Sequence, residues 1–316
     1  MRKVWMNLLR VLISVGALAF LFWNVGLSDT VNVLLQASLR YLLAAFALFV
    51  LSMVIRAARW YVLLRGLDAT VSFWRLLRLY FVGQFFNSFL PTSFGGDVVR
   101  AVELTQDTDP SDAIGTVILD RMTGLLVLFA MGLAVLPFYA SALEPWLVRT
   151  LLLVSCVGLA GGALVLEGRV LRRITRYLPA RISLAGQGTL AKVYAAVTGC
   201  GWRAIGGAFM VSLIFNIVNV FINWLCGRAV GAHAGVGYFF AVTPLISVSL
   251  LIPSIGGWGV REAVSTAVFA PARIEASVAA ALGIAMGGVA LATGLVGGLV
   301  YLGESLYHMW DRSRPV

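Results

Sequence analysis

Long apolar stretches separated by short polar segments dominate the pattern of this 316-residue chain. A helix that crosses a bilayer needs about 17 to 25 mostly apolar residues. Six stretches meet that condition, at residues 8–24, 41–64, 113–140, 147–167, 204–230 and 276–303. The first follows Arg2, Lys3 and Arg10 and is not followed by a small-residue cleavage site, so we expect an uncleaved span rather than a signal peptide. The pattern therefore predicts six transmembrane helices.

Two further apolar regions, residues 73–104 and 238–272, contain helix-breaking residues near their centres. The breakers are Pro91, Gly95 and Gly96 in the first region, and Pro253, Gly256, Gly257 and Gly259 in the second. Broken helices are tolerated at membrane depth where protein covers the free backbone groups or where they line a polar cavity. We expect both regions to be broken helical hairpins.

The two broken regions share a motif. LPTSFGGDVVR at 90–100 returns as IPSIGGWGVR at 252–261, with a proline, a serine, a glycine pair and an arginine in the same order. A glycine pair recurs easily by chance among 33 glycines, but the shared order of all five elements favours a true repeat. The copies are asymmetric directly after the glycine pair, where Asp97 in the first is Trp258 in the second.

The composition excludes a soluble domain, because 60% of the residues are hydrophobic and only 12% are charged. The net charge of +10 lies largely in loops, which indicates anionic lipid headgroups rather than nucleic acid as the counter-charge. Segment 168–203 holds seven basic residues and no acidic one, so the positive-inside rule makes it cytoplasmic. The three scattered cysteines form no CxxC pair, and we predict no disulfide framework, metal site or cofactor.

The topology that follows is an inverted repeat within one integral membrane domain, residues 1–316. With the basic loop 168–203 inside, region 73–104 starts and ends at the cytoplasm, while region 238–272 starts and ends outside. Repeat unit one, about 41–140, and unit two, about 204–303, then have opposite orientations. The sequence thus predicts an all-α polytopic protein of the cytoplasmic membrane, with two oppositely oriented re-entrant hairpins and both termini in the cytoplasm.

Candidate binding chemistry lies at the hairpin tips. A helix that begins at the glycine pair would present free backbone N–H groups and a positive dipole end, and an arginine follows one turn later. Each tip also offers a serine hydroxyl. The tip candidates are Gly95, Gly96, Arg100 and Ser93 in the first copy, and Gly256, Gly257, Arg261 and Ser254 in the second. This pattern suits a phosphate-bearing lipid, although the glycines are equally suited to tight helix packing.

Other charges fall within apolar segments, where an unpaired charge costs about 3 kcal/mol on insertion scales. They are Asp120 and Arg121 in span 113–140, Arg56 and Arg59 at the cytoplasmic end of span 41–64, and Asp97, Glu103 and Glu262 beside the hairpin helices. We expect these side chains to face a hydrated polar cavity. Purely structural ion pairs are the alternative, and Asp97 and Arg100 have the i, i+3 spacing of a local pair.

The segments RAARWYVLLRGLD, FFNSFLPTSFGGDVVRAVELTQD, ILDRMTGLLVL and LIPSIGGWGVREA together resemble the lysylphosphatidylglycerol synthase transmembrane-region family, also called flippase-like domain proteins. The resemblance covers roughly residues 8–305. It implies the membrane fold and a lipid-translocating role, carried by Gly95, Gly96, Asp97, Arg100, Asp120, Arg121, Gly256, Gly257, Arg261 and Glu262. In the multiple peptide resistance factors this domain is joined to an aminoacyl transferase, which we do not expect here because the sequence ends at Val316.

Three functions remain open from the sequence. The first is a flippase that carries an anionic lipid headgroup, phosphate-bearing or aminoacylated, between the hairpins. The second is an intramembrane lipid-linked glycosyl- or phosphotransferase that uses Asp97, Asp120 and Glu262 as acid and base. It is disfavoured because HExxH, GxSxG and DDxxD motifs are missing from the sequence. The third is a non-catalytic partner of lipid-biosynthetic enzymes. We predict the transporter, with no catalytic residues.

Overall fold

The computed structural model describes residues 27–90, 94–177, 184 and 188–312, and every regular element in this part of the chain is a helix. Five helices there are long and apolar enough to cross a membrane, namely α3 (Leu39–Arg65), α6 (Pro110–Tyr139), α7 (Pro145–Glu167), α10 (Gly201–Ala229) and α13 (Ala276–Arg312) over its residues 276–303. They coincide within a few residues with five of the six predicted spans. The predicted span 8–24 lies outside the described residues. The chain is a multi-pass helical membrane protein.

Both regions predicted to be broken contain two helices with a break between them. α4 (Phe73–Phe89) is followed by α5 (Gly95–Leu104), and α11 (Val236–Ser249) is followed by α12 (Val260–Phe269). In each region the two helices contact one another. The second break contains Gly256, Gly257 and Gly259 at positive φ, which non-glycine residues rarely adopt. The glycine pairs therefore mark the breaks as predicted, with Gly95 and Gly96 at the start of α5, whereas Pro91 lies outside the described residues.

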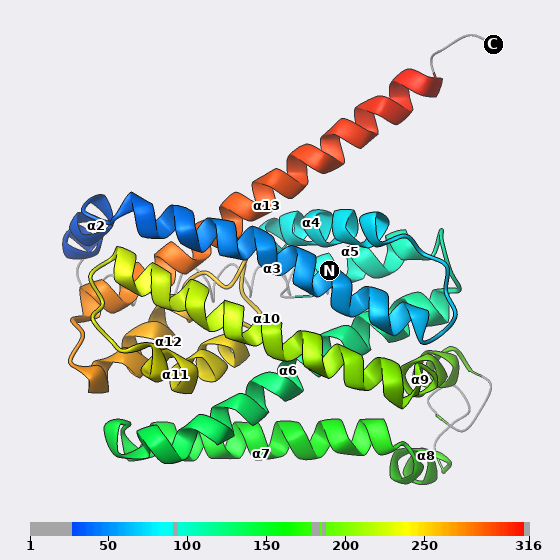
Figure 1. Ribbon diagram of the computed structural model, residues 1–316, viewed down its shortest axis with the longest axis horizontal. Coiled ribbons are helices and arrows are strands. Elements are labelled where there is room, and N and C mark those ends of the chain that lie inside the picture. The colour runs from blue at the N-terminus through cyan, green and yellow to red at the C-terminus, as the bar shows by residue number, and fades with distance from the viewer. Residues whose placement is uncertain (1–26, 91–93, 178–183, 185–187, 313–316) are drawn as a thin grey trace, which may run out of the picture.

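Short helices complete the described part of the fold. They are α2 (Leu27–Leu35), η1 (Ala140–Ala142), α8 (Arg169–Thr175), α9 (Thr189–Gly199) and η2 (Ala270–Ala272). Figure 1 shows α3 and α10 running side by side, with α7 along one edge of the bundle next to α6. The largest apolar core joins α6, α7, α10, α11, α12 and α13 around the fully buried rings of Phe239 and Phe269.

Close backbone contact fixes α13 against α4. A Cβ atom on Gly297 would overlap the carbonyl oxygen of Phe81, and one on Gly294 would lie 2.8 Å from Oγ of Ser88. Small residues allow such an approach between helices in a membrane, where van der Waals packing is a main source of helix association. This contact places the C-terminal half of α4, which carries several polar side chains, beside α13.

Candidate functional site

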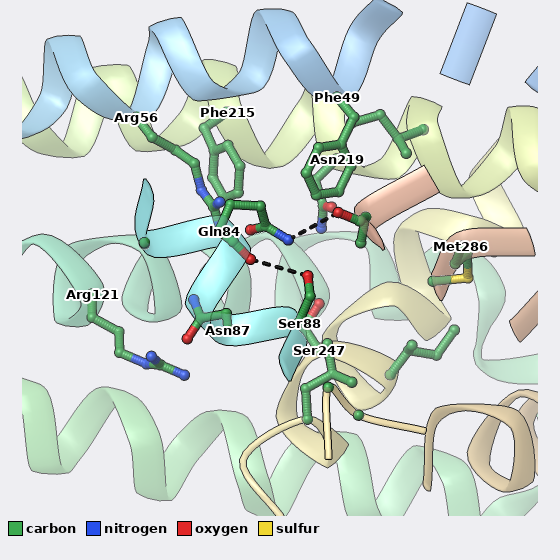
Figure 2. Close-up of a pocket in the computed structure, with 18 of the residues that line it drawn as sticks. Phe49, Arg56, Gln84, Asn87, Ser88, Arg121, Phe215, Asn219, Ser247 and Met286 are labelled. Carbon is green, nitrogen blue, oxygen red and sulfur yellow. Dashed lines mark hydrogen bonds between the residues drawn. The ribbon is translucent and has the colours of Figure 1, made fainter. Parts of the chain in front are cut away.

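A cavity of about 310 Å³ lies among α3, α4, α5, α6, α10, α11, α12 and α13 (Figure 2). Its wall receives residues from both broken regions, so the two tips share one space. The charged lining residues are Arg56, Arg59, Asp97, Arg100, Asp120, Arg121 and Arg261. Five cations and two carboxylates give this lining a surplus of positive charge, which favours an anionic ligand.

Asp120 lies at the centre of the charged cluster. Its carboxylate accepts a hydrogen bond from Nε of Arg59 at 2.6 Å, a second from the Tyr80 hydroxyl, and longer ones from Arg100 at 3.5 Å. The side chains of Arg59 and Asp120 are only 5% and 2% exposed. Arg59 also donates to the Ser212 hydroxyl at 3.2 Å. A buried ion pair is tolerated when such additional hydrogen bonds satisfy its remaining polar atoms.

Asp97 links two arginines at the first tip. It accepts from Nη2 of Arg100 at 2.7 Å and also pairs with Arg121, which comes from α6. The local Asp97–Arg100 pair considered from the spacing is therefore present. Arg100 is bound by Asp97 and Asp120 together, and its guanidinium lies 4.0 Å from the centroid of the Tyr80 ring. The predicted ion pairs and the predicted polar cavity occur at the same place.

Glycines on neighbouring helices make room for three of the buried arginines. A Cβ atom on Gly83 would lie 2.9 Å from Cγ of Arg100, one on Gly124 would lie 2.7 Å from Nη1 of Arg59, and one on Gly287 would overlap the guanidinium of Arg261. Each arginine is thus held in a slot that a larger residue would fill.

At the second tip, Arg261 is held by its own hairpin and by α13. Its Nη2 donates to Oε1 of Glu262 at 3.0 Å, and its Nε donates to the carbonyl oxygen of Gly283 at 2.8 Å. The other carboxylate oxygen of Glu262 accepts from the N–H of Gly259 at 2.6 Å and so caps the start of α12. The Trp258 ring lies 5.0 Å from the Arg261 guanidinium, where the first copy has Asp97 instead.

Several predicted tip residues serve the hairpins and lie outside the lining. The N–H of Gly96 donates to Oδ1 of Asn87 at 2.7 Å, so the expectation that this N–H is free for an anion is wrong. A Cβ atom on Gly95 would meet the Leu90 side chain at 2.6 Å, and the buried hydroxyl of Ser254 donates to Ile252. Gly95, Gly96, Ser254 and Glu262 are not among the described residues that line the cavity, whereas Gly256 and Gly257 are. Ser93 lies outside the described residues.

Neutral polar residues from two helices complete the polar lining and were missed by the sequence analysis. They are Asn216, Asn219 and Asn223 on α10, and Gln84, Asn87 and Ser88 on α4. Their spacing of three or four residues places each set on one helix face. A polar stripe within an apolar span was the signal that would have found the α10 set. The rest of the wall is apolar, with Leu128, Ile222, Ile246, Leu250 and Leu291 among its residues, so the cavity is amphiphilic.

The fold and this cavity define a multi-pass helical membrane protein with a charged internal site. The sequence profile of the lysylphosphatidylglycerol synthase TM region matches residues 7–298, and the chain belongs to that family. It is similar to UPF0104 membrane protein PH1989 of Pyrococcus horikoshii, at 23% identity over 86% of this chain and 89% of that protein. It is also similar to UPF0104 membrane protein MJ1595 of Methanocaldococcus jannaschii, at 22% identity over 89% of each chain. The family resemblance expected from the motifs is confirmed.

Proposed function

We propose that this protein moves lipids with an anionic, phosphate-bearing headgroup between the leaflets of the cytoplasmic membrane. The observation that carries the proposal is the single cavity that both hairpin tips share, with five arginines and two carboxylates in its lining. A family named for a phospholipid synthase fits a lipid substrate, and its membrane domain is associated with flippase-like function. The headgroup passes through the polar cavity while its acyl chains stay in the bilayer.

An inverted-topology repeat is part of this proposal, and the helix contacts support it. If α3, α4, α5 and α6 correspond to α10, α11, α12 and α13, each main contact has a counterpart. The α4–α13 contact corresponds to α11–α6, α3–α13 to α10–α6, and α5–α6 to α12–α13. Pro110 and Pro271 also follow Arg100 and Arg261 by the same ten residues. Two units of this kind on either side of a shared site are typical of alternating-access transporters.

The orientation that we propose follows from the basic segment 168–203, which would lie in the cytoplasm with both termini. The first hairpin then enters from the cytoplasm and the second from outside. Contact between their tips supports this arrangement, because a Cβ atom on Gly256 would lie 2.9 Å from the carbonyl oxygen of Ser88. Two re-entrant hairpins that meet tip to tip would place the cavity near the middle of the bilayer.

We infer that the protein is a transporter rather than an enzyme. Asp120 accepts hydrogen bonds from three side chains and Asp97 pairs with two arginines. Carboxylates committed in this way hold the arginines in place and are poorly arranged to exchange protons with a substrate. At the first tip, Asp97 holds Arg100 and Arg121 in place. The second tip has Trp258 at that position, so the two tips would treat a headgroup differently.

Reconstitution into liposomes tests the proposal directly. Fluorescently labelled phosphatidylglycerol and other anionic lipids are incorporated symmetrically, and dithionite then bleaches the outer leaflet. We expect the protein to raise the bleached fraction well above the half that protein-free vesicles show. Rates equal to those of protein-free vesicles for every anionic lipid tested would refute the proposal. Chromatography of the same lipids would reveal covalent turnover, which would favour the transferase instead.

A further inference from the structure

Arg56 of α3 lines the cavity, and the sequence marked it as a charge within a predicted span but not as a binding residue. Its guanidinium lies 4.9 Å from the centroid of the Phe215 ring and 5.9 Å from that of Tyr80. The polar contact of its side chain is a weak one with Sδ of Met53, at 3.9 Å. Figure 2 shows Arg56 extending from α3 toward Phe215.

Each of the other four arginines of the lining has an ion-pair partner. Arg59 pairs with Asp120, Arg100 with Asp97 and Asp120, Arg121 with Asp97, and Arg261 with Glu262. For Arg56, the described part of the chain contains no carboxylate within ion-pair distance. The five arginines thus share three carboxylates, and Arg56 is the one of the five without an ion-pair partner among the described residues.

We infer that Arg56 is the residue that binds the phosphate of the transported headgroup, an inference that rests on the proposed function. A cation in a partly buried site without a counter-ion is unfavourable, and an entering anion relieves that condition. The planar guanidinium can donate two parallel hydrogen bonds to a phosphate, which a lysine cannot do. The arginines that carry ion pairs shape the cavity, and Arg56 recognises its occupant.

Neutral donors in the same lining complete this phosphate subsite. Because Oδ1 of Asn87 accepts from Gly96, its Nδ2 group remains as a donor. Asn219 lines the cavity one helical turn after Phe215, whose ring packs beside Arg56. Such amides suit the ester oxygens and hydroxyls of a phosphodiester headgroup. Inorganic phosphate offers the same oxygen atoms, so the test must separate the two sources.

Binding to the purified full-length chain in detergent tests the assignment. Short-chain phosphatidylglycerol, short-chain phosphatidylcholine and inorganic phosphate are titrated separately, and Kd is taken from the shift in thermal unfolding. We expect phosphatidylglycerol to bind most tightly. Arg56→Gln should weaken that binding about tenfold or more, which corresponds to about 1.4 kcal/mol. The Kd of Arg56→Lys for phosphatidylglycerol should lie between those of the wild type and Arg56→Gln. Equal binding of inorganic phosphate, lost in the same variants, would support the anion subsite but exclude a lipid headgroup as its preferred occupant.

The matched control is Arg65→Gln, on the same helix, because Arg65 is exposed and its side chain contacts Tyr61. This control should bind like the wild type. Unchanged Kd values in both Arg56 variants would refute the phosphate subsite at Arg56. The proposed function would still stand if liposomes that contain the wild-type protein move lipid. A wild type that neither binds nor moves any anionic lipid would overturn the proposed function itself. If Arg56→Gln does not fold, the Kd of Arg56→Lys decides the question.

Discussion

Replacing Asp120 by asparagine should destabilise the protein strongly, because it removes the carboxylate at the centre of the charged cluster. Arg100 would keep Asp97 as its partner, so the loss falls mainly on Arg59, whose side chain is 5% exposed. Leaving one member of a buried pair without its partner costs about 3–5 kcal/mol. We expect the free energy of unfolding to fall by about 3 kcal/mol, since the asparagine oxygen and Ser212 still accept hydrogen bonds from Arg59. That is a large part of the roughly 5–15 kcal/mol by which folded domains are stable.

The measurement is thermal unfolding of purified protein in detergent, with Asp109→Asn as the control. Asp109 is exposed, directly precedes the same helix and makes no side-chain capping bond, so its replacement should change stability by less than about 0.5 kcal/mol. The double variant of Asp120→Asn with Arg59→Gln should be more stable than the sum of the two single effects predicts. A Tm for Asp120→Asn equal to that of the control, or strictly additive effects, would show that the cluster does not hold these helices together.

Three further outcomes are expected. Gly287→Ala should lower the Tm, at a cost of about 1–3 kcal/mol, because its methyl group would overlap the buried guanidinium of Arg261. In the control Gly288→Ala the methyl group points into open space, so this variant should be neutral or slightly stabilising. Equal Tm values for the two variants would contradict the packing. Burial raises the pKa of Cys200 to about 11, so its thiol should resist a hydrophilic maleimide at pH 7.5 and react after unfolding in detergent. The neutral Cys200 thiol contributes to the stability of the fold below pH about 9, and this contribution is lost as the pH rises toward 11. Rapid maleimide labelling of the native protein at pH 7.5 would contradict the burial of Cys200. To test the orientation, cysteines are introduced at Arg173 and at Glu275 and treated with a membrane-impermeant thiol reagent in intact cells. The cysteine at Arg173 should be protected and the one at Glu275 should react. The reverse result would invert the proposed topology.

The helices were predictable because their signals are local. A run of about twenty apolar residues is long enough to span a bilayer whatever surrounds it, and proline or paired glycines interrupt a helix by their own backbone geometry. The five described spans and both breaks therefore follow from the sequence alone. The presence of Arg100 and Arg261 beside one cavity was also expected from the repeat of the motif, and that of Asp97 and Asp120 from the cost of a charge within an apolar segment.

The details of the site depend on contacts between distant segments, which the sequence does not display. Gly96 is capped by Asn87 only because α4 and α5 fold against each other. Among the described residues, the lining arginine without an ion-pair partner is Arg56, because Asp120 pairs with Arg59, sixty-one positions away in the chain. A charge in a span indicates that a partner exists, but the pairing is set by packing. That is why the phosphate-binding residue that we infer, Arg56, lies on α3 and was not assigned that role from the sequence.

The fixed arginines of the cavity also have an electrical consequence. They stay with the protein, so in the proposed transport the charge that crosses the membrane in each passage would be that of the headgroup itself. A membrane potential of 100 mV changes the free energy of one elementary charge by about 2.3 kcal/mol, or roughly fiftyfold in its distribution. With the cell interior negative, the voltage would push a singly anionic lipid outward through this cavity. Arginines that bind the substrate without travelling with it would thus let the potential bias the direction of transport.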